Sequence, residues 1–522
     1  MYLRENETIG SVLHEIAERF PTRTAVIDSE GRYTFAELEQ HVNQLAGYLL
    51  GLGIKKADHV GIWAKDDAMT LTVFYALWRI GAVAVPLCTS FVKAELERCC
   101  EQADLSWIIA GTSHKGQSFS EFIGTPDSPV RMICIENARP GGFASPVSDS
   151  FVAQAASLVT PADPDTILFT SGTTGAGKPV VTTHYNRINT VHAQAETLQA
   201  DEKDVFCSAL PMYHCFSLTA TILAAMSVGA CVCFPADRHS QTILQAIADE
   251  KCTVFTAVPT LFSALLRRYA EQPYDLTSLK KGLIGGSTYS PDLFIQIEKT
   301  FSMTLLSSLG QTEATAGLTA ASMDDPLELR AATIGTFFPL VEGSIRDILS
   351  NEALDPGKEG EICIRGYNVM QGYYKLPEST AKVIDRDGWL HTGDLGKIDE
   401  NGYITYTGRL KELIIRGGEN IAPSELENIL AADPRVRQVK VLGVPDAHYT
   451  EEVCACVVKN DDSLSADDVR SLVAAQAACF KIPRYVLFLE ELPLTAVGKV
   501  DLRMLRKLAV DKLAEGSDSS AE

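Results

Sequence analysis

The stretch that decides the fold is TSGTTGAGKP, residues 170–179, which lies between two apolar, β-branched segments. The segment TILF (166–169) leads into it and VVTT (180–183) leads out of it. Its glycines allow backbone N–H groups to turn toward a ligand, its hydroxyl groups add donors, and Lys178 adds a positive charge. The sequence therefore predicts a phosphate-binding loop between two strands.

The spacing from Gly172 to Lys178 also fits the pattern G-x-x-x-x-G-K, the P-loop of kinases and ATPases. Position 179 is Pro, so the hydroxyl group that would hold Mg²⁺ in a P-loop is missing. The β-branched residues that follow favour a strand, whereas a P-loop opens a helix. We therefore expect a different kind of nucleotide-binding loop.

The loop resembles the signature T-S-G-T-T-G-x-P-K-G of the acyl-adenylate-forming superfamily. That superfamily includes acyl-CoA synthetases, adenylation domains of peptide synthetases and beetle luciferases. Gly177 and Pro179 replace the family's Pro and final Gly, while the lysine keeps its place. The resemblance implies that the β- and γ-phosphates of ATP are bound by Thr170, Ser171, Gly172, Thr173, Thr174, Gly175 and Lys178.

Composition limits the class of protein. The chain has 522 residues, 46% of them hydrophobic, which suffices for more than one domain. A net charge of −21 argues against general binding of nucleic acid or anionic membranes. Thirteen cysteines without a C-x-x-C pair indicate reduced thiols, and the start MYLRENETIG lacks the apolar core of a secretory signal. We expect a cytoplasmic monomer or homodimer that neither binds nucleic acid nor spans a membrane.

Helical and strand patterns alternate along the first part of the chain. Helices are expected over residues 10–20 and 36–52, and strands over 24–27 and 60–63. This alternation predicts an α/β fold with mostly parallel sheets. Residues 112–164 are rich in Ser, Pro, Gly and Asp and are expected to be irregular surface. A smaller α+β module is expected at the end of the chain.

The resemblance covers nearly the whole chain and implies three parts. Residues 1–408 form a large N-terminal domain of several subdomains, which carries the ATP and acyl sites. Residues 409–513 form a small, mobile C-terminal domain on a hinge. Residues 514–522 are small and polar and are expected to be a disordered tail.

The segment LIGGS (283–287) predicts a strand that ends in two glycines, and a tight turn is the alternative. In the family, adenine and the acyl group lie against such bare backbone. The resemblance therefore assigns this role to Gly285, Gly286 and Ser287.

The segment SLGQTE (308–313) resembles the family pattern Y-G-x-T-E. A hydroxyl group beside a carboxylate suits Mg²⁺ that bridges to phosphate oxygens, so the resemblance implies metal binding by Thr312 and Glu313. Leu309 replaces the aromatic residue that stacks on the base in the family. The remaining residues assigned to the ATP site are Ser308, Leu309 and Gly310.

The segment PMYHCF (211–216) contains a histidine that could simply be a core residue at a strand end. It matches the family motif P-x-x-H at the mouth of the acyl pocket. The resemblance therefore places His214 and Phe216 at the acyl group, together with Gly285 and Ser287. The pocket walls are expected from residues 214–217, 283–288 and 309–317. Apart from His214, these windows contain no cationic residue, which favours an apolar aryl or aliphatic acid.

Two segments are expected to contact the ribose and to form the hinge. GWLHTGD (388–394) ends in Asp394, whose carboxylate can accept both ribose hydroxyls, although an isolated Asp is more often a turn residue. GRLKE (408–412) could be an exposed basic turn. The resemblance instead implies that Arg409 contacts ribose or phosphate and that Lys411 is the hinge. The glycine-containing passage for CoA would comprise Arg416, Gly417 and Gly418.

The segment LPLTAVGKV (492–500) resembles L-P-x-T-x-x-G-K-I, the motif of the family's catalytic lysine. A solvated surface lysine is the alternative for Lys499. The block GEICIRG (360–366), followed by Tyr373 and Tyr374, also matches the family and is expected to be mainly structural.

The resemblance implies an ATP-dependent carboxylic acid–CoA ligase. The acid would become an acyl-adenylate with release of pyrophosphate, and the acyl group would then pass to the thiol of CoA. The expected catalytic residues are Lys499, His214 and Glu313, with Mg²⁺ neutralising the phosphates. One alternative is a free-standing adenylation enzyme that loads a carrier protein, and another is a non-catalytic nucleotide-binding relative.

Overall fold

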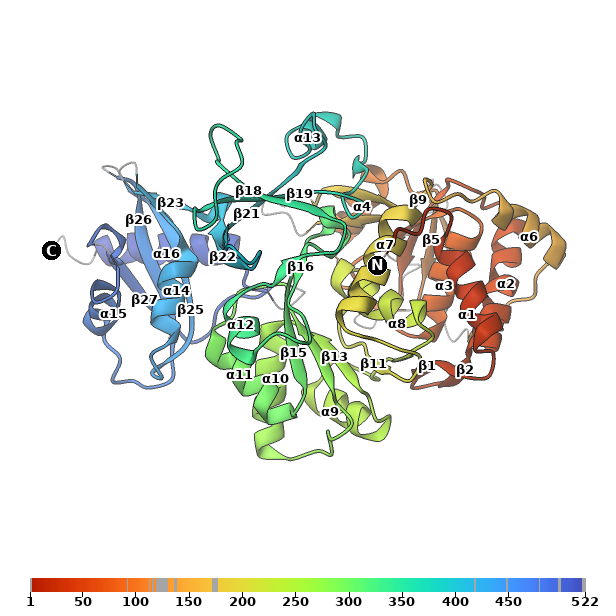
Figure 1. Ribbon diagram of the computed structural model, residues 1–522, viewed down its shortest axis with the longest axis horizontal. Coiled ribbons are helices and arrows are strands. Elements are labelled where there is room, and N and C mark those ends of the chain that lie inside the picture. The colour runs from red at the N-terminus through yellow and green to blue at the C-terminus, as the bar shows by residue number, and fades with distance from the viewer. Residues whose placement is uncertain are drawn as a thin grey trace.

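The computed structural model describes residues 2–91, 93–111, 113–114, 117–118, 130–135, 139–170, 177–416, 419–446, 449–477, 479–495 and 499–518. Two large sheets with helices between and around them form most of the molecule, and a smaller lobe follows at the C-terminal end (Figure 1). The α/β class with mostly parallel strands is therefore confirmed. Among the helices described, none combines the length and the apolar composition needed to cross a bilayer.

The first large sheet has nine strands, and its central members are parallel. It ends at the antiparallel pairs β1–β2 on one side and β15–β16–β17 on the other. From edge to edge it contains β17 (Thr336–Phe337), β16 (Thr319–Ala320), β15 (Thr304–Leu309), β14 (Lys281–Ile284), β13 (Val254–Ala257), β11 (Val205–Cys207), β12 (Cys231–Cys233), β1 (Thr24–Asp28) and β2 (Gly31–Thr34).

The second large sheet has seven strands. From edge to edge it contains β20 (Gly372–Tyr373), β10 (Pro179–Thr183), β9 (Pro164–Phe169), β4 (Val83–Pro86), β3 (His59–Trp63), β5 (Trp107–Ala110) and β8 (Arg131–Cys134). Strands β9 and β10 form an antiparallel hairpin. The expected phosphate loop is the connection between them, so the strand predicted after the loop is confirmed and the P-loop alternative, which needs a helix there, is excluded.

Apolar helices share the largest core with both sheets. They are α1 (Ile9–Arg19), α2 (Phe35–Gly51), α3 (Ala68–Arg79), α7 (His184–Thr197), the π-helix η1 (Phe216–Leu223) and α8 (Ala224–Ser227). Every residue of α3 is buried, because neighbouring elements cover all sides of the helix. A second core lies between the nine-stranded sheet and α9 (Ser240–Asp249), α10 (Pro259–Glu271), α11 (Pro291–Phe301) and α12 (Leu327–Ala332). The seven-stranded sheet packs against α4 (Lys93–Gln102), and α6 (Asp149–Ser157) packs against α2.

The expectation that residues 112–164 are irregular is wrong in part. Strand β8 extends the parallel edge beside β5, and α6 is a regular helix. Ser148 caps α6 by accepting a hydrogen bond from the backbone N–H of Phe151, and Asp149 lies in the first turn. Ser and Asp are common at such a helix start, and they gave this segment its loop-like composition. The short pair β6 (Ser113–His114) and β7 (Gln117–Ser118) also falls in this region.

A four-stranded antiparallel sheet follows the large sheets in the chain. Its strands are β18 (Glu342–Arg346), β19 (Gly360–Arg365), β21 (Leu390–Ile398) and β22 (Ile404–Arg409), and the short helices η2 (Thr312–Ala314) and α13 (Pro377–Ala381) lie nearby in the sequence.

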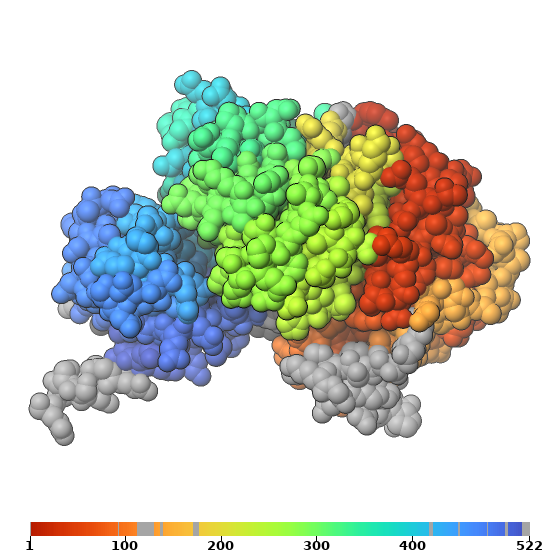
Figure 2. Space-filling model, turned by 90° about the horizontal axis from the view of Figure 1, so that it is seen from below, coloured from red at the N-terminus to blue at the C-terminus, as the bar shows by residue number. Residues whose placement is uncertain are grey.

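The C-terminal lobe has its own sheet and core. Its elements are η3 (Leu410–Glu412), β23 (Ile414–Arg416), β24 (Glu419–Ile421), α14 (Pro423–Ala431), β25 (Val436–Asp446), β26 (Thr450–Lys459), α15 (Ala466–Ala474), η4 (Cys479–Lys481), β27 (Tyr485–Leu489) and α16 (Leu502–Asp518). On the face shown in Figure 2, this lobe lies against the green central segment and away from the red N-terminal one. Helix α16 extends to Asp518, into the segment 514–522 that was expected to be a tail, and residues 519–522 lie outside the described residues.

A buried ion pair ties the hairpin of the phosphate loop to neighbouring helices. Asp165 on β9 and Arg187 on α7 are both fully buried, and the Arg187 Nε atom lies 2.6 Å from Asp165 Oδ2. The other two guanidinium nitrogens donate to Thr182 on β10 and to Thr219 on η1, each at 2.6 Å. Burial raises the pKa of Asp165, but Arg187 and His184 outweigh it and hold that pKa below its usual value. This network connects β9, β10, α7 and η1.

We expect Arg187→Met to lower the free energy of unfolding by about 3–5 kcal/mol at neutral pH, because it leaves the Asp165 carboxylate buried without a counter-charge. Chemical denaturation followed by tryptophan fluorescence measures this. The matched control is Lys251→Met, which breaks an exposed pair with Asp275 and should leave the midpoint unchanged. Equal midpoints for the two variants would contradict the assignment.

Candidate active site

The neck of the phosphate loop is closed by two hydrogen bonds. The backbone N–H of Thr170 donates to the carbonyl of Lys178 at 3.0 Å, and the N–H of Lys178 donates to Thr170 Oγ1 at 3.1 Å. Five predicted phosphate ligands lie outside the described residues, namely Ser171, Gly172, Thr173, Thr174 and Gly175. The structure therefore describes the two ends of the loop, and their position follows from the β9–β10 hairpin.

Lys178 and Glu313 are connected through a tyrosine. The Lys178 Nζ atom lies 4.5 Å from the centre of the Tyr373 ring, and the Tyr373 hydroxyl donates to Glu313 Oε1 at 2.8 Å. Burial, and then the negative charge of Glu313, raise the pKa of Tyr373, so its hydroxyl remains a neutral donor. Strand β20 holds Tyr373 beside β10, with Tyr373 in register with Val180. The block that contains Tyr373 was expected to be mainly structural, and the contact with Glu313 could not be read from the sequence.

Thr312 and Glu313 offer oxygen donors on a short turn. The Thr312 hydroxyl donates to Cys215 Sγ at 3.7 Å, and the backbone N–H of Met370 donates to the Glu313 carbonyl at 2.9 Å. These contacts hold η2 against the segment before η1 and against the loop before β20. A carboxylate and a hydroxyl form a hard oxygen donor set, which fits Mg²⁺ that keeps water and phosphate oxygens as its other ligands.

His214 lies half-buried just before η1. Its Nε2 atom is buried and has no hydrogen-bond partner among the described residues. Burial lowers the pKa of His214 to about 4, and the positive charges of Lys499 and Arg238 act in the same direction. The imidazole is therefore neutral at physiological pH. It can contact a carboxylic acid or its ester as an uncharged polar group.

The glycines after β14 have close neighbours. A Cβ atom on Gly285 would lie 2.8 Å from the Ser308 carbonyl oxygen and 3.8 Å from Phe216 Cζ, so only glycine fits beside β15. Gly286 has φ +84°, in the left-handed region, and Gly286 and Ser287 are exposed at this edge of the sheet. The structure thus brings Gly285 and Phe216 together, as predicted.

The other residues predicted for the ATP site lie at the end of β15 and directly after it. The Ser308 hydroxyl donates to the Thr319 carbonyl at 2.9 Å, so it supports the sheet. Leu309 packs at the edge of a core cluster that includes Ile345, Ile362 and Ile404. A Cβ atom on Gly310 would lie 1.8 Å from the Ala316 carbonyl oxygen, so this position also requires glycine.

Asp394 and Arg409 are cross-strand partners on β21 and β22. Asp394 is 1% exposed, and its Oδ1 atom lies 2.8 Å from Arg409 Nε. Its Oδ2 atom is buried and lacks a hydrogen-bond partner within the described part of the chain. Burial raises the pKa of the Asp394 carboxyl, and Arg409 opposes that rise. An unpartnered buried carboxylate oxygen is costly unless a ligand supplies a donor, and ribose hydroxyls are such donors.

Lys499 reaches this site from the C-terminal lobe. Its Cε and Nζ atoms lie 3.8 and 3.9 Å from the position of a Cβ on Gly286. Burial lowers the pKa of Lys499; Arg409 also lowers it, while Cys215 and Asp394 raise it. The loop that carries Lys499 is closed by the Thr495 N–H, which donates to the Lys499 carbonyl at 2.7 Å. The structure therefore brings together Lys499, Gly286, Asp394 and Arg409.

Lys411 was predicted as the hinge and Arg416 as part of the CoA passage, and neither contributes to this group. Lys411 is exposed on η3. Arg416 forms a bidentate pair with the buried Glu452, at 2.7 and 3.0 Å, and its guanidinium lies over the Tyr449 ring. Its charge is thus used within the C-terminal lobe. The neighbouring Gly417 and Gly418 lie outside the described residues.

Comparison with known proteins agrees with this geometry. Residues 13–374 match the model of the AMP-binding enzyme family, and residues 425–499 match that of the AMP-binding enzyme C-terminal domain. A Bacillus subtilis protein named as an acyl-CoA synthetase is 35% identical over 97% of this chain and 98% of its own length. The mitochondrial medium-chain acyl-CoA ligase of Rattus norvegicus is 30% identical over 96% of this chain and 87% of its own.

The fold has close solved counterparts. ATP-bound MatB from Rhodopseudomonas palustris superimposes with a TM-score of 0.84 at 26% identity, covering 97% of this chain and 99% of that one. The apo form of the same protein superimposes with a TM-score of 0.75 at the same identity and coverage. The chain belongs to the AMP-binding enzyme family and is an ATP-dependent, AMP-forming acyl-CoA synthetase.

Proposed function

We propose that this enzyme activates an apolar monocarboxylic acid with Lys499 at the reacting centre and that CoA accepts the acyl group. The position of the Lys499 Nζ atom beside Gly286, with His214, Asp394 and Arg409 around it, carries the proposal. In this arrangement Lys499 of the C-terminal lobe faces His214 and Asp394 of the N-terminal domain.

The first step joins two anions, since a carboxylate oxygen attacks the α-phosphorus of ATP and pyrophosphate leaves. Lys499 reduces the repulsion between them by contacting both the carboxylate and the α-phosphate. Lys178, held over Tyr373, faces the departing phosphates. Bound near Thr312 and Glu313, Mg²⁺ would supply further positive charge to the phosphate oxygens.

The nucleoside and the acid occupy neighbouring positions in this proposal. Asp394 accepts the ribose hydroxyls through its unpartnered Oδ2 atom, and Arg409 keeps that carboxylate in place. Adenine lies against the backbone at Gly286 and Ser287, beside Ser308, Leu309 and Gly310. The acid passes neutral His214 and lies between Phe216 and Gly285.

The second step requires the thiol of CoA to reach the acyl carbonyl. We propose a division at residues 408 and 409, with Lys411 on η3 as the hinge and residues 409–513 as the mobile domain. Lys499 then leaves, and the segment Arg416–Gly418 lines the passage for the pantetheine chain. A carrier-protein thiol is the alternative acceptor, and a comparison of CoA with a loaded carrier protein as acceptor distinguishes the two.

The acid is proposed to be of medium length and without a second charge. Support comes from the apolar residues of η1 beside the site and from the medium-chain name of the Rattus norvegicus relative. The pocket windows predicted from the sequence contain no Lys or Arg that would pair with a second carboxylate.

Lys499→Ala should slow adenylation by about 10²–10³-fold, the cost of removing one charge-stabilising donor from a reacting centre. ATP–pyrophosphate exchange measures this step. Transfer of a supplied acyl-adenylate to CoA should change little, since Lys499 has left by then. Lys507→Ala, which changes an exposed lysine of the same lobe, should alter neither reaction. Equal loss of both half-reactions in Lys499→Ala would refute the two-step assignment.

Tyr373→Phe keeps the ring under Lys178 but removes the hydrogen bond to Glu313. A hydrogen bond to a charged group contributes about 1.5–3 kcal/mol, so adenylation should slow by about tenfold or more, with a higher Mg²⁺ requirement. Titration of exchange activity with Mg²⁺ measures both effects. The matched control is Tyr374→Phe, whose hydroxyl bonds to the exposed Asp104. An unchanged Mg²⁺ dependence in Tyr373→Phe would remove Tyr373 from this role.

A series of straight-chain acids tests the pocket. Burying each added methylene group contributes about 0.8 kcal/mol of binding free energy, so kcat/KM should rise about fourfold per carbon until the pocket is filled. A dicarboxylic acid of the same length should be a poor substrate, because its second charge would be desolvated without a partner. Preference for the dicarboxylic acid would contradict the apolar pocket.

A further inference from the structure

The strand that carries Asp394 leaves the regular ladder just before that residue. Glu361 on β19 pairs with Leu395, and Cys363 pairs with His391, so the single residue Ile362 faces three residues of β21, 392–394. Bulges of this kind redirect a side chain at functional sites. The bulge therefore determines where the Asp394 carboxylate points.

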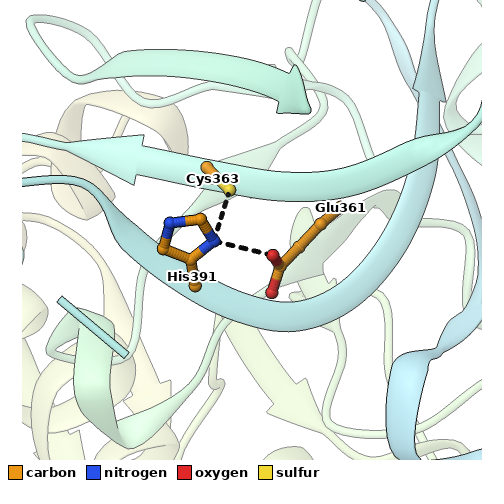
Figure 3. A group of neighbouring side chains, drawn as sticks. All are labelled: Glu361, Cys363 and His391. Atoms are coloured by element: carbon orange, nitrogen blue, oxygen red, sulfur yellow. Dashed lines mark hydrogen bonds and ion pairs between the residues drawn. The ribbon is translucent and has the colours of Figure 1, made fainter. Parts of the chain in front are cut away.

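Glu361 holds both sides of this bulge. Its Oε1 atom accepts the backbone N–H of Gly393 at 2.8 Å, and its Oε2 atom lies 2.7 Å from Nδ1 of His391 (Figure 3). Glu361 is 7% exposed, so these contacts are made in a poorly hydrated place, where they are strong. Gly393 has φ +71°, and it directly precedes Asp394. Loss of the Glu361 carboxylate would free the peptide group on which the position of Asp394 depends.

A second side chain completes the bulge. The Thr392 hydroxyl donates to the Ile362 carbonyl at 2.6 Å and accepts the backbone N–H of Asp394 at 3.0 Å. At residues 392–394, hydrogen bonds from the side chains of Thr392 and Glu361 thus replace the backbone hydrogen bonds to β19. A β-bulge that buried side-chain hydrogen bonds hold in place indicates a functional requirement.

We propose that Glu361 is a positioning residue for ribose recognition: it acts through Gly393 to aim Asp394 at the ribose hydroxyls. The inference rests on the proposed role of Asp394. The inference explains why the Glu361 carboxylate, which is not expected to contact a substrate, hydrogen-bonds to the turn that precedes Asp394.

The same cluster contains donor types that bind zinc, since the Cys363 Sγ atom lies 3.5 Å from His391 Nδ1. Positioning is favoured because the His391 Nδ1 atom is engaged at hydrogen-bond distance by Glu361.

The test compares kcat/KM for ATP with that for 2′-deoxy-ATP and 3′-deoxy-ATP, because a defect in ribose recognition lowers the preference for ATP. Asp394→Asn should reduce that preference by about tenfold or more. Glu361→Ala should reduce it by at least about threefold, and Glu361→Gln, which keeps an acceptor for Gly393, should retain most of it. In the Asp394→Asn background, Glu361→Ala should cause no further loss of preference.

Cys363→Ser is the matched control, two residues along the same strand, and should keep the preference of the unmodified enzyme. If Glu361→Ala does not fold, His391→Asn serves as the second test. It removes the other contact of Glu361 and should also lower the preference for ATP. Equal loss of activity with all three nucleotides in the Glu361 and His391 variants would overturn the inference. An unchanged preference in Asp394→Asn would overturn the ribose assignment itself. Stoichiometric zinc in the purified protein, absent from Cys363→Ser, would replace the hydrogen-bond assignment with a metal site.

Discussion

Electrostatic repulsion between a carboxylate and a triphosphate is the constraint on which the rest of the structure depends. A cation must lie between the two anions, yet it must also be removable before a thiol can enter. In the proposed mechanism Lys499 meets both needs, because it lies on a loop of the C-terminal lobe and its side chain approaches Gly286, just after β14. The φ of +84° at Gly286 favours glycine, and the Lys499 side chain lies within van der Waals range of this position.

The site also contains polar atoms that the protein itself leaves unsatisfied. The Nε2 atom of His214 and the Oδ2 atom of Asp394 are buried without partners among the described residues. Burying such atoms costs free energy, and only rigid surroundings can keep them in place. The Arg187 network under the phosphate loop and the bulge of β21 provide that rigidity. Ligand groups that hydrogen-bond to these two atoms would recover part of the cost. The position in which a ligand binds best would therefore also be the position in which its reacting groups are aligned.

Short-range patterns were the most predictable part of this molecule. The strands on both sides of the phosphate loop, the α/β class and the family were all recognisable, because β-branched runs and motif spacing depend on local chemistry. The irregular surface expected for residues 112–164 was wrong where a parallel neighbour turned a weak pattern into β8.

The chemical groups available to the site follow from the order of residues alone: a loop of N–H and hydroxyl donors, the lysines 178 and 499, and the carboxylates 313 and 394. How these groups meet depends on the packing of the folded chain. Tyr373 contacts Glu313 across 60 positions of the chain, and Lys499 reaches Gly286 from another lobe. Contacts of this separation depend on how sheets and lobes pack, and burial then raises the pKa of Asp394 and lowers the pKa of Lys499. Local sequence patterns carry no information about either, because both arise from neighbours that are distant in the chain.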